Sequence, residues 1–303
     1  MIAVPASFIP PYLRAVGANE AFVSAEGAHR RVRERALRPR PFGPPPRLRP
    51  RVRIAARRVH RWPVYTLTPP QRDPAGSVVY VHGGGWVNEI ATQHWRLAAQ
   101  ICAEANMQVV VPIYPLVPFG TATQALDGVT SLLLDQRHTF RRVAVAGDSA
   151  GGQIALSAAL ALRDQGVRLD TTVLISPALD LSFGNPEIPR VQPHDPWLAV
   201  PGGRVLADLW AGDRAIDDPA VSPLAGELAG LGPITVFTGT HDVLNPDARQ
   251  FAIKARAAGV DLDYHQVDGQ VHVYPLLPTR AGAAARASMV ATFRHVAAER
   301  STA

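Results

Sequence analysis

The 303-residue sequence contains one cysteine, one lysine and no long hydrophobic run. A lone Cys102 cannot form an intramolecular disulfide, which fits folding in a reducing compartment. No apolar run approaches the roughly 18–20 residues that a membrane-spanning helix requires. The first residues, MIAVPASFIPPYLR, lack both a basic start and a long apolar stretch, so they make a poor secretory signal. We therefore expect a cytoplasmic protein that does not enter a membrane.

The formal charge of +6 comes from one segment. Residues 30–61 contain thirteen arginines and one glutamate, or +12, whereas the remaining 18 basic and 24 acidic residues give −6. The prolines of RPRPFGPPPRLRP favour an extended chain, and the segment lacks the interleaved aromatic side chains that stack on bases. We therefore expect no nucleic-acid partner and interpret the segment as a solvated linker or lobe surface. A further hypothesis places it beside a binding-site entrance, where it would favour acidic substrates.

From residue 76 onward, short β-branched apolar runs alternate with segments of helical apolar spacing. Strands are expected at residues 76–82, 107–114, 141–147, 171–177, 234–239 and 260–267. Helices are expected at residues 91–106, 123–136, 149–166, 246–258 and 281–299. This alternation predicts an α/β fold, in which helices cover both faces of a parallel sheet. Residues 180–232 interrupt this alternation and are longer than a usual connection between two strands. Their two tryptophans favour an ordered lid.

The stretch VAVAGDSAGGQIAL, residues 143–156, runs from an expected strand into an expected helix. Ser149 stands at the junction, with Gly147 and Gly151 two residues to either side. A Gly-x-Ser-x-Gly turn of this kind presents a serine hydroxyl at the carboxyl ends of the strands, where ligands bind in parallel sheets. The pattern alone is modest evidence, but its position at a strand–helix junction makes Ser149 a candidate nucleophile.

A second motif, HGGGW at residues 82–86, directly follows the expected strand at 76–82. Three consecutive glycines are an unfavourable choice for a structural turn, because each loses much conformational entropy on folding. They do allow backbone N–H groups to approach a ligand atom such as the oxyanion of a tetrahedral intermediate. We assign the oxyanion donors to Gly83, Gly84 and Ala150, the last at the positive end of a helix.

A serine nucleophile needs a base, and the base needs an orienting carboxylate. The histidines downstream of Ser149 are His194, His241, His265, His272 and His295. We predict His272 as the base, because it follows the last expected strand in a loop that contains Gly269. By itself His272 would be an ordinary loop histidine. The other histidines fall in the insertion, on a strand, in the last helix or, like His82 and His241, beside the site as structural neighbours.

The acid is expected between the serine and the histidine in the chain. Asp242 comes directly after a core strand, at the same edge of the sheet as Ser149. Asp247 falls on an expected helix, and Asp268 is too close in sequence to His272 to approach it easily. We therefore predict Asp242 as the acid.

Six motifs (HGGGW, GDSAGG, SPALDL, DPAVSPL, GTHDVL and VHVYP) occur in an order and spacing similar to the hormone-sensitive-lipase-like α/β-hydrolases, bacterial esterases with an HGGG loop. The resemblance covers residues 76–299. It implies an α/β-hydrolase fold with an eight-stranded, mostly parallel sheet and a helical cap. The implied parts are an N-terminal cap segment and Arg/Pro-rich linker (1–50), a core (51–179 and 233–303) and a cap insertion (180–232). The predicted triad and oxyanion residues match those of the family.

The expected function is a serine carboxylesterase that hydrolyses short-chain acyl esters without a metal or cofactor. The alternatives are a natural-product deacetylase, a lactonase or an amidase with the same machinery, or a non-catalytic ligand-binding member. The expected partner is a small-molecule ester, and a homodimer is left open. Trp86, Trp197 and Trp210 are candidate substrate-binding residues, although each could belong to the core of the cap. Phe119 and Gln153 stand where the family commonly has Glu and Asn.

Overall fold

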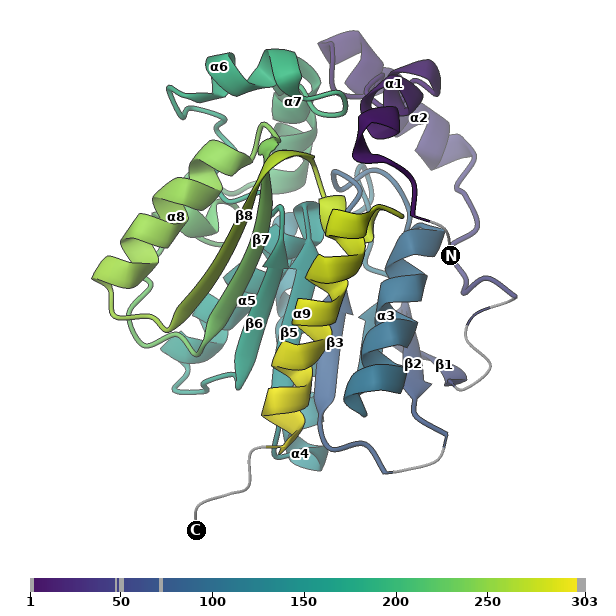
Figure 1. Ribbon diagram of the computed structural model, residues 1–303, viewed down its shortest axis with the longest axis vertical. Helices are drawn as coiled ribbons and strands as arrows, with labels where there is room; N and C mark the ends of the chain where they lie inside the picture. Colours follow the sequence, from purple (N-terminus) through teal and green to yellow (C-terminus); the bar gives the residue numbers. More distant parts are fainter. Residues whose placement is uncertain (1–2, 47, 49–51, 71–72, 299–303) are drawn as a thin grey trace.

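The apolar β-branched runs of the sequence form the centre of an eight-stranded sheet in the order β1-β2-β4-β3-β5-β6-β7-β8 (Figure 1). The computed structural model describes residues 3–46, 48, 52–70 and 73–298. Its strands are β1 (Arg53–Val59), β2 (Trp62–Thr68), β3 (Ser77–Val81), β4 (Gln108–Pro112), β5 (Val143–Asp148), β6 (Thr171–Ile175), β7 (Ile234–His241) and β8 (Leu262–Val271). The pairs β1/β2 and β2/β4 are antiparallel and the other neighbours are parallel. The expected α/β class is confirmed.

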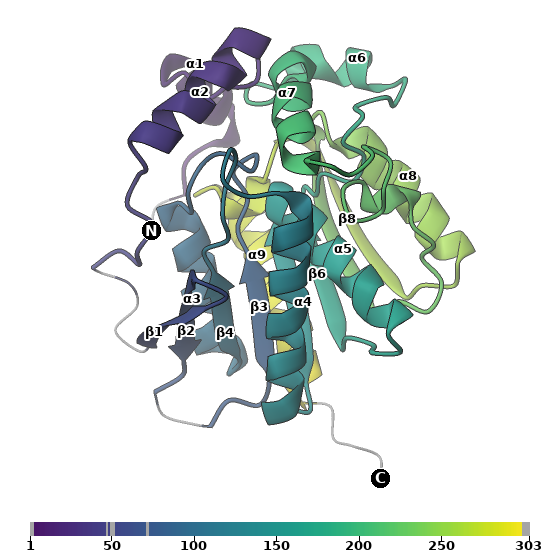
Figure 2. The same cartoon turned by 180° about the vertical axis from the view of Figure 1, so that it is seen from behind.

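Helices cover both faces of the sheet, which is why the inner strands are buried and apolar on both sides (Figures 1 and 2). The long core helices are α3 (Thr92–Ala105), α4 (Ala122–Thr139), α5 (Ala150–Asp164), α8 (Asn245–Ala257) and α9 (Arg280–Ala298). Along β3, Val79 and Val81 belong to the hydrophobic cluster that includes side chains of α4, α5 and α8, whereas Val78 and Tyr80 belong to the cluster that includes side chains of α3 and α9. The two-residue period of the strand thus divides its side chains between two hydrophobic clusters.

Four further helices lie beyond the carboxyl ends of the parallel strands, at the top of Figure 1, and we call them the cap layer. They are α1 (Ile9–Ala15), α2 (Ala25–Leu37), α6 (Ile188–Val191) and α7 (Val200–Ala211). The short helices are η1 (Ala6–Phe8), η2 (Gln192–His194), η3 (Pro223–Ala225) and η4 (Tyr274–Leu276). Helix α2 packs against α7, and the Gly202 amide donates a hydrogen bond to the Phe22 carbonyl over 2.7 Å. The N-terminal segment and the 180–232 insertion therefore meet in one layer.

The arginine-rich segment differs from the extended linker expected for it. Its first part lies in helix α2, which begins after Ser24, whose hydroxyl accepts a hydrogen bond from the Gly27 amide over 3.0 Å. Its last part contains the edge strand β1, where six of seven residues are exposed. The boundary expected at residue 50 and the end of the helix expected at 281–299 lie outside the described residues. In the described part of the chain, no helix is long and apolar enough to span a membrane.

Candidate active site

Ser149 occupies the tight turn between β5 and α5, with φ +52° and ψ −119°. The glycines around it are required by close backbone contacts. A Cβ atom on Gly147 would lie 2.2 Å from the Gly151 carbonyl oxygen, and one on Gly151 would lie 2.1 Å from the Val81 carbonyl oxygen. Only glycine fits at both positions, so the Gly-x-Ser-x-Gly pattern follows from sterics and leaves the Ser149 side chain on the cavity wall.

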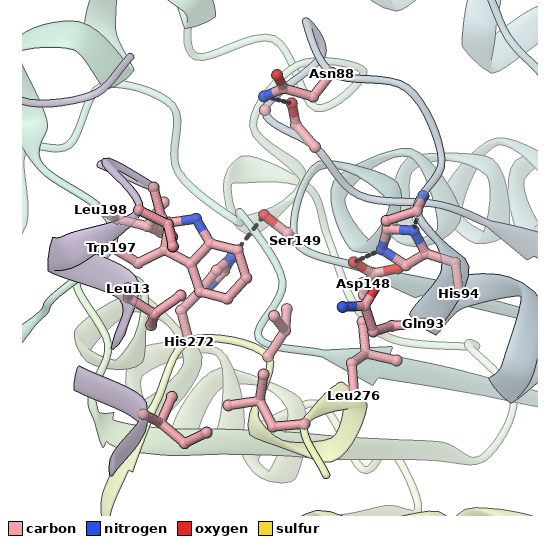
Figure 3. A pocket seen from close by; sticks show the side chains of 18 of the residues that line it. Leu13, Asn88, Gln93, His94, Asp148, Ser149, Trp197, Leu198, His272 and Leu276 are labelled. Carbon is pink, nitrogen blue, oxygen red and sulfur yellow. Dashed lines mark hydrogen bonds and ion pairs between the residues drawn. The ribbon is translucent and has the colours of Figure 1, made fainter. Parts of the chain in front are cut away.

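The serine, histidine and aspartate singled out in the sequence form one hydrogen-bonded chain. Nε2 of His272 lies 3.0 Å from Oγ of Ser149 (Figure 3), and Nδ1 lies 2.9 Å from Oδ2 of Asp242. Asp242 directly follows β7 and His272 directly follows β8, so adjacent strands bring them together. A carboxylate at Nδ1 holds the proton there, which leaves Nε2 free to accept the serine proton. Strand β8 continues to Val271, so Gly269 lies within this strand and not in the expected loop.

The alternative acids are used elsewhere. Asp247 accepts a hydrogen bond from the Asn185 side chain over 2.8 Å, and Asp268 accepts one from the Thr240 hydroxyl over 2.8 Å.

The other histidines downstream of Ser149 also have different neighbours. His194 and His241 stack on each other with ring centroids 5.3 Å apart. His265 stacks on Phe237, and His295 lies in α9. These residues therefore compete with neither His272 nor Asp242.

The glycine loop differs from the sequence-based assignment at one position. The Gly83 amide donates a hydrogen bond to Oδ1 of Asp148 over 3.1 Å, so it is not available as an oxyanion donor. Gly84 and Gly85, with φ +132° and +60°, line the cavity instead. Within the described residues, the amides of Gly84, Gly85 and Ala150 donate no hydrogen bond. The assignment of Gly83 is therefore wrong, and Gly85 replaces it as a candidate donor.

Asp148 anchors this loop. Its buried carboxylate accepts hydrogen bonds from the Tyr80 hydroxyl over 2.7 Å and from Nε2 of His94 over 3.1 Å, in addition to the Gly83 amide. Nδ1 of His94 accepts a hydrogen bond from the Ala91 amide over 2.9 Å, so the ring proton sits on Nε2. Burial alone would raise the pKa of Asp148, but His94 and the other donors hold it below its usual range. A charged side chain at the end of this strand thus positions the glycine loop.

Asp195, which sequence reasoning missed, connects the cap insertion to the loop that carries Asp242. Oδ1 of Asp195 accepts hydrogen bonds from the amides of Trp197 over 2.8 Å and Leu198 over 2.9 Å. Oδ2 accepts one from the Val243 amide over 2.8 Å. Burial, with a further contribution from neighbouring Asp242, raises the pKa of Asp195 to about 6. No sequence signal links this residue to the site, since the contact spans 48 positions.

The buried His272 ring is surrounded by carboxylates. Burial disfavours the imidazolium and by itself would lower the pKa of His272. The hydrogen-bonded Asp242 raises it, and the charges of Asp195 and Asp148 add to this effect, so the pKa lies above its ordinary value. The site therefore stabilises the protonated form of the His272 ring.

The three candidate tryptophans lie in two different environments. Trp197 lines the cavity and meets His272 edge-on, with ring centroids 5.8 Å apart. Trp86 and Trp210 are 3% and 0% exposed, stack on each other, and both donate their indole N–H groups to Oε1 of Gln153. Neither lines the cavity. The structure thus corrects the sequence-based assignment of Trp86 and Trp210, which join the HGGGW loop to α7.

The site opens into a cavity of about 880 Å³ beneath the cap layer. Arg31 and Arg40, from the arginine-rich segment, also line it, so the preference for acidic substrates stays a prediction. Arg31 donates a hydrogen bond to Asn88 and lies 3.4 Å from the Glu34 carboxylate, which partly neutralises its charge. Phe119 is 71% exposed and lies away from the cavity. Among the described residues, no group of three or more His, Cys, Asp or Glu side chains is arranged to hold a metal ion.

Comparison with known proteins gives a consistent result. Residues 78–276 match the model of a family described by the α/β-hydrolase fold. The chain is 30% identical over 292 residues to the carboxylesterase NlhH of Mycobacterium tuberculosis, covering 88% of each. It is 30% identical over 217 residues to an acetyl-hydrolase of Streptomyces hygroscopicus, covering 69% of this chain and 73% of that protein. A solved esterase of the bacterial hormone-sensitive lipase family aligns with a TM-score of 0.77 and 28% identity, over 88% of this chain and 96% of that one. This chain is therefore a hydrolase of the α/β-hydrolase family and belongs to its hormone-sensitive-lipase-like bacterial esterases.

Proposed function

We propose that the protein is a serine carboxylesterase that hydrolyses esters of short-chain acids through an acyl-enzyme intermediate. The observation that carries this proposal is the chain of hydrogen bonds from Asp242 through His272 to Ser149, which ends on the wall of the cavity. The unpaired amides of Gly84, Gly85 and Ala150 supply the second requirement, a site for developing negative charge.

In the proposed reaction, Nε2 of His272 takes the Ser149 proton as Oγ attacks the ester carbonyl carbon. The carbonyl oxygen becomes an oxyanion, and each amide donor that receives it contributes roughly 3–4 kcal/mol to the stabilisation of the transition state. The protonated His272 then gives its proton to the leaving alcohol oxygen as the C–O bond breaks. Water, deprotonated by the same ring, attacks the acyl-enzyme, and the acid leaves as Oγ regains a proton.

An active-site titration with a p-nitrophenyl alkylphosphonate tests this proposal. One phosphonyl group should attach to Ser149, with release of one equivalent of p-nitrophenol and complete loss of p-nitrophenyl acetate hydrolysis, because the tetrahedral adduct resembles the transition state. Intact-protein and peptide mass spectrometry identify the modified residue. Hydrolysis that persists after Ser149 is fully modified, or an absence of hydrolysis for acetate through butyrate esters, contradicts the proposal.

The pH dependence offers a second prediction. His272 must be neutral to accept a proton, so kcat/KM falls as the pH decreases through its pKa. The Asp195 charge helps to raise that pKa. Asp195→Asn keeps an oxygen for the Trp197 and Leu198 amides but removes the charge and the acceptor of the Val243 amide. Because the charge is lost, the acidic limb of the profile should move to lower pH. A stopped assay of kcat/KM from pH 4.5 to 9 measures the position of this limb.

Asp247→Asn is the matched control for Asp195→Asn. Asp247 is also buried and bonded to the cap insertion, through Asn185, and burial raises its pKa to about 7. It does not contribute to the pKa shift of His272. The control should leave the acidic limb in place. If Asp195→Asn lowers activity but leaves the limb unmoved, its role is structural and the electrostatic explanation fails.

A further inference from the structure

One wall of the cavity is apolar and lies against His272. Ile9 and Leu13 of α1 form a hydrophobic cluster with Val271 and Leu277, and Trp197 packs against it. Val271 directly precedes His272 in the chain, and the Trp197 ring meets the His272 ring edge-on at 5.8 Å. The apolar wall therefore lies next to the His272 side chain.

The opposite side of the cavity carries several polar side chains beside the glycine loop, and Leu276 lies on the same side (Figure 3). The Asn88 amide group donates a hydrogen bond to the Gly84 carbonyl over 3.0 Å, and Arg31 donates one to Oδ1 of Asn88 over 2.9 Å. His94 and Asp148, hydrogen-bonded to each other, also line the cavity. Figure 3 shows His94 on the opposite side of Ser149 from Trp197. The two walls therefore differ in chemistry and flank the nucleophile.

The reaction assigns one half of the ester to each wall. His272 gives its proton to the leaving oxygen, so the alcohol group of the substrate must lie on the His272 side. The carbonyl oxygen faces the amides of the glycine loop and α5, so the acyl group points away from His272, and we assign it to the side of Asn88 and His94. A long alkyl chain on that side would lie against the side chains of Asn88 and His94, so its burial would gain less free energy than burial along the apolar wall.

Space also favours a small acyl group. A Cβ atom on Gly85 would lie 3.1 Å from the Phe22 ring, so the glycine loop is closed from above at this point. On the apolar side, Phe8, Tyr12 and Val16 follow one another at four-residue spacing along α1 and its end. They line the cavity and are 62%, 63% and 55% exposed, so the apolar surface continues to the rim. The apolar surface on the alcohol side is therefore long enough to lie along a large substituent.

We propose that the substrates of this site are short-chain acyl esters, such as acetates, of large apolar alcohols. The alcohol lies along the wall formed by α1, Trp197 and Leu277, and the acyl group occupies the space beside Asn88 and His94. This inference rests on the proposed esterase function and adds the orientation and the class of the alcohol.

Two isomeric esters test the orientation. Octyl acetate and ethyl octanoate have the same atoms and closely similar hydrophobicity, but their long chains lie on opposite sides of the carbonyl. At concentrations below aggregation, kcat/KM measured by pH-stat should be about tenfold or more higher for octyl acetate, since each matched methylene in an apolar pocket contributes to discrimination. Equal values, or a preference for ethyl octanoate, overturn the inference.

Truncation of the apolar wall provides an independent readout. Leu13→Ala should lower kcat/KM about tenfold more for octyl acetate than for ethyl acetate, because the longer alcohol makes more contact with this wall. The ethyl acetate rate and the thermal midpoint show whether the variant is folded. Ile253→Ala, an apolar truncation at a 70% exposed position of α8, is the matched control and should alter neither rate. An equal loss for both esters in Leu13→Ala overturns the inference.

Failure of this inference can be distinguished from failure of the proposed function. If the protein hydrolyses p-nitrophenyl acetate in a Ser149-dependent manner but prefers ethyl octanoate, the esterase function stands and the orientation is wrong. If neither isomer nor p-nitrophenyl acetate is hydrolysed, the proposed function itself fails.

Discussion

Ser149→Ala should lower kcat for an acetyl ester by about 10⁶-fold, the order of magnitude expected when the nucleophile of a serine hydrolase is removed. The substitution removes only Oγ, which is the atom that His272 contacts at 3.0 Å. The backbone bonds of Ser149 remain, because its amide donates to the Ile175 carbonyl and its carbonyl accepts from the Ala178 amide. The loss of activity should therefore occur without loss of the fold.

Ser157→Ala is the matched control for this substitution. Ser157 lies on the same helix, α5, and is 2% exposed. Its hydroxyl donates a hydrogen bond of 2.9 Å to the Pro219 carbonyl, and the residue does not line the cavity. Its activity should stay within a few-fold of the wild type even if its thermal midpoint falls slightly. p-Nitrophenyl acetate turnover and thermal unfolding of both variants give the comparison. The assignment of Ser149 as the nucleophile would be wrong if Ser149→Ala kept more than about a tenth of the wild-type activity. It would also be wrong if Ser157→Ala lost as much activity as Ser149→Ala.

The sequence predicted the elements of the site that depend on sheet topology. Ser149, Asp242 and His272 each follow an expected strand, and parallel strands end at the same edge of the sheet. Their convergence therefore required only that the strands be recognised, which the β-branched runs allowed. Strands β1 and β2 were missed, because the arginines of β1 interrupt any apolar alternation and a proline stands at Pro63 in β2.

The residues that sequence reasoning misplaced depend on contacts between distant segments. Gly83 and Gly85 are equivalent in the sequence, and it is Asp148, 65 positions away, that takes the amide of the first. Trp86 is directed into the core by Gln153, 67 positions away. Neither partner can be identified from local pattern or composition, because the first contact joins the ends of strands β3 and β5 and the second joins the glycine loop to helix α5.

Asp242→Asn should lower kcat by about 10⁴-fold, and the reason is the position of one proton. Oδ1 of Asp242 accepts a hydrogen bond from the Leu244 amide over 2.9 Å, so an asparagine would keep its oxygen there and direct its NH₂ group at His272. Nδ1 would then have to accept that hydrogen bond, which places the ring proton on Nε2. A histidine protonated at Nε2 cannot take the proton of Ser149, so the geometry would survive and the base would be lost.

The comparison that decides this argument is between two carboxylates beside the same ring. Asp195→Asn also removes a negative charge near His272, but Asp195 bonds to the amides of the cap loop and of Val243, and not to the ring. It should therefore retain most of its activity at alkaline pH, where His272 is neutral, whereas Asp242→Asn should remain impaired throughout the range in which the ring carries a single proton. Measurements of kcat from pH 5 to 9 separate the two. If both variants recovered fully at high pH, charge alone would account for the role of Asp242, and the argument from the tautomer of His272 would be wrong.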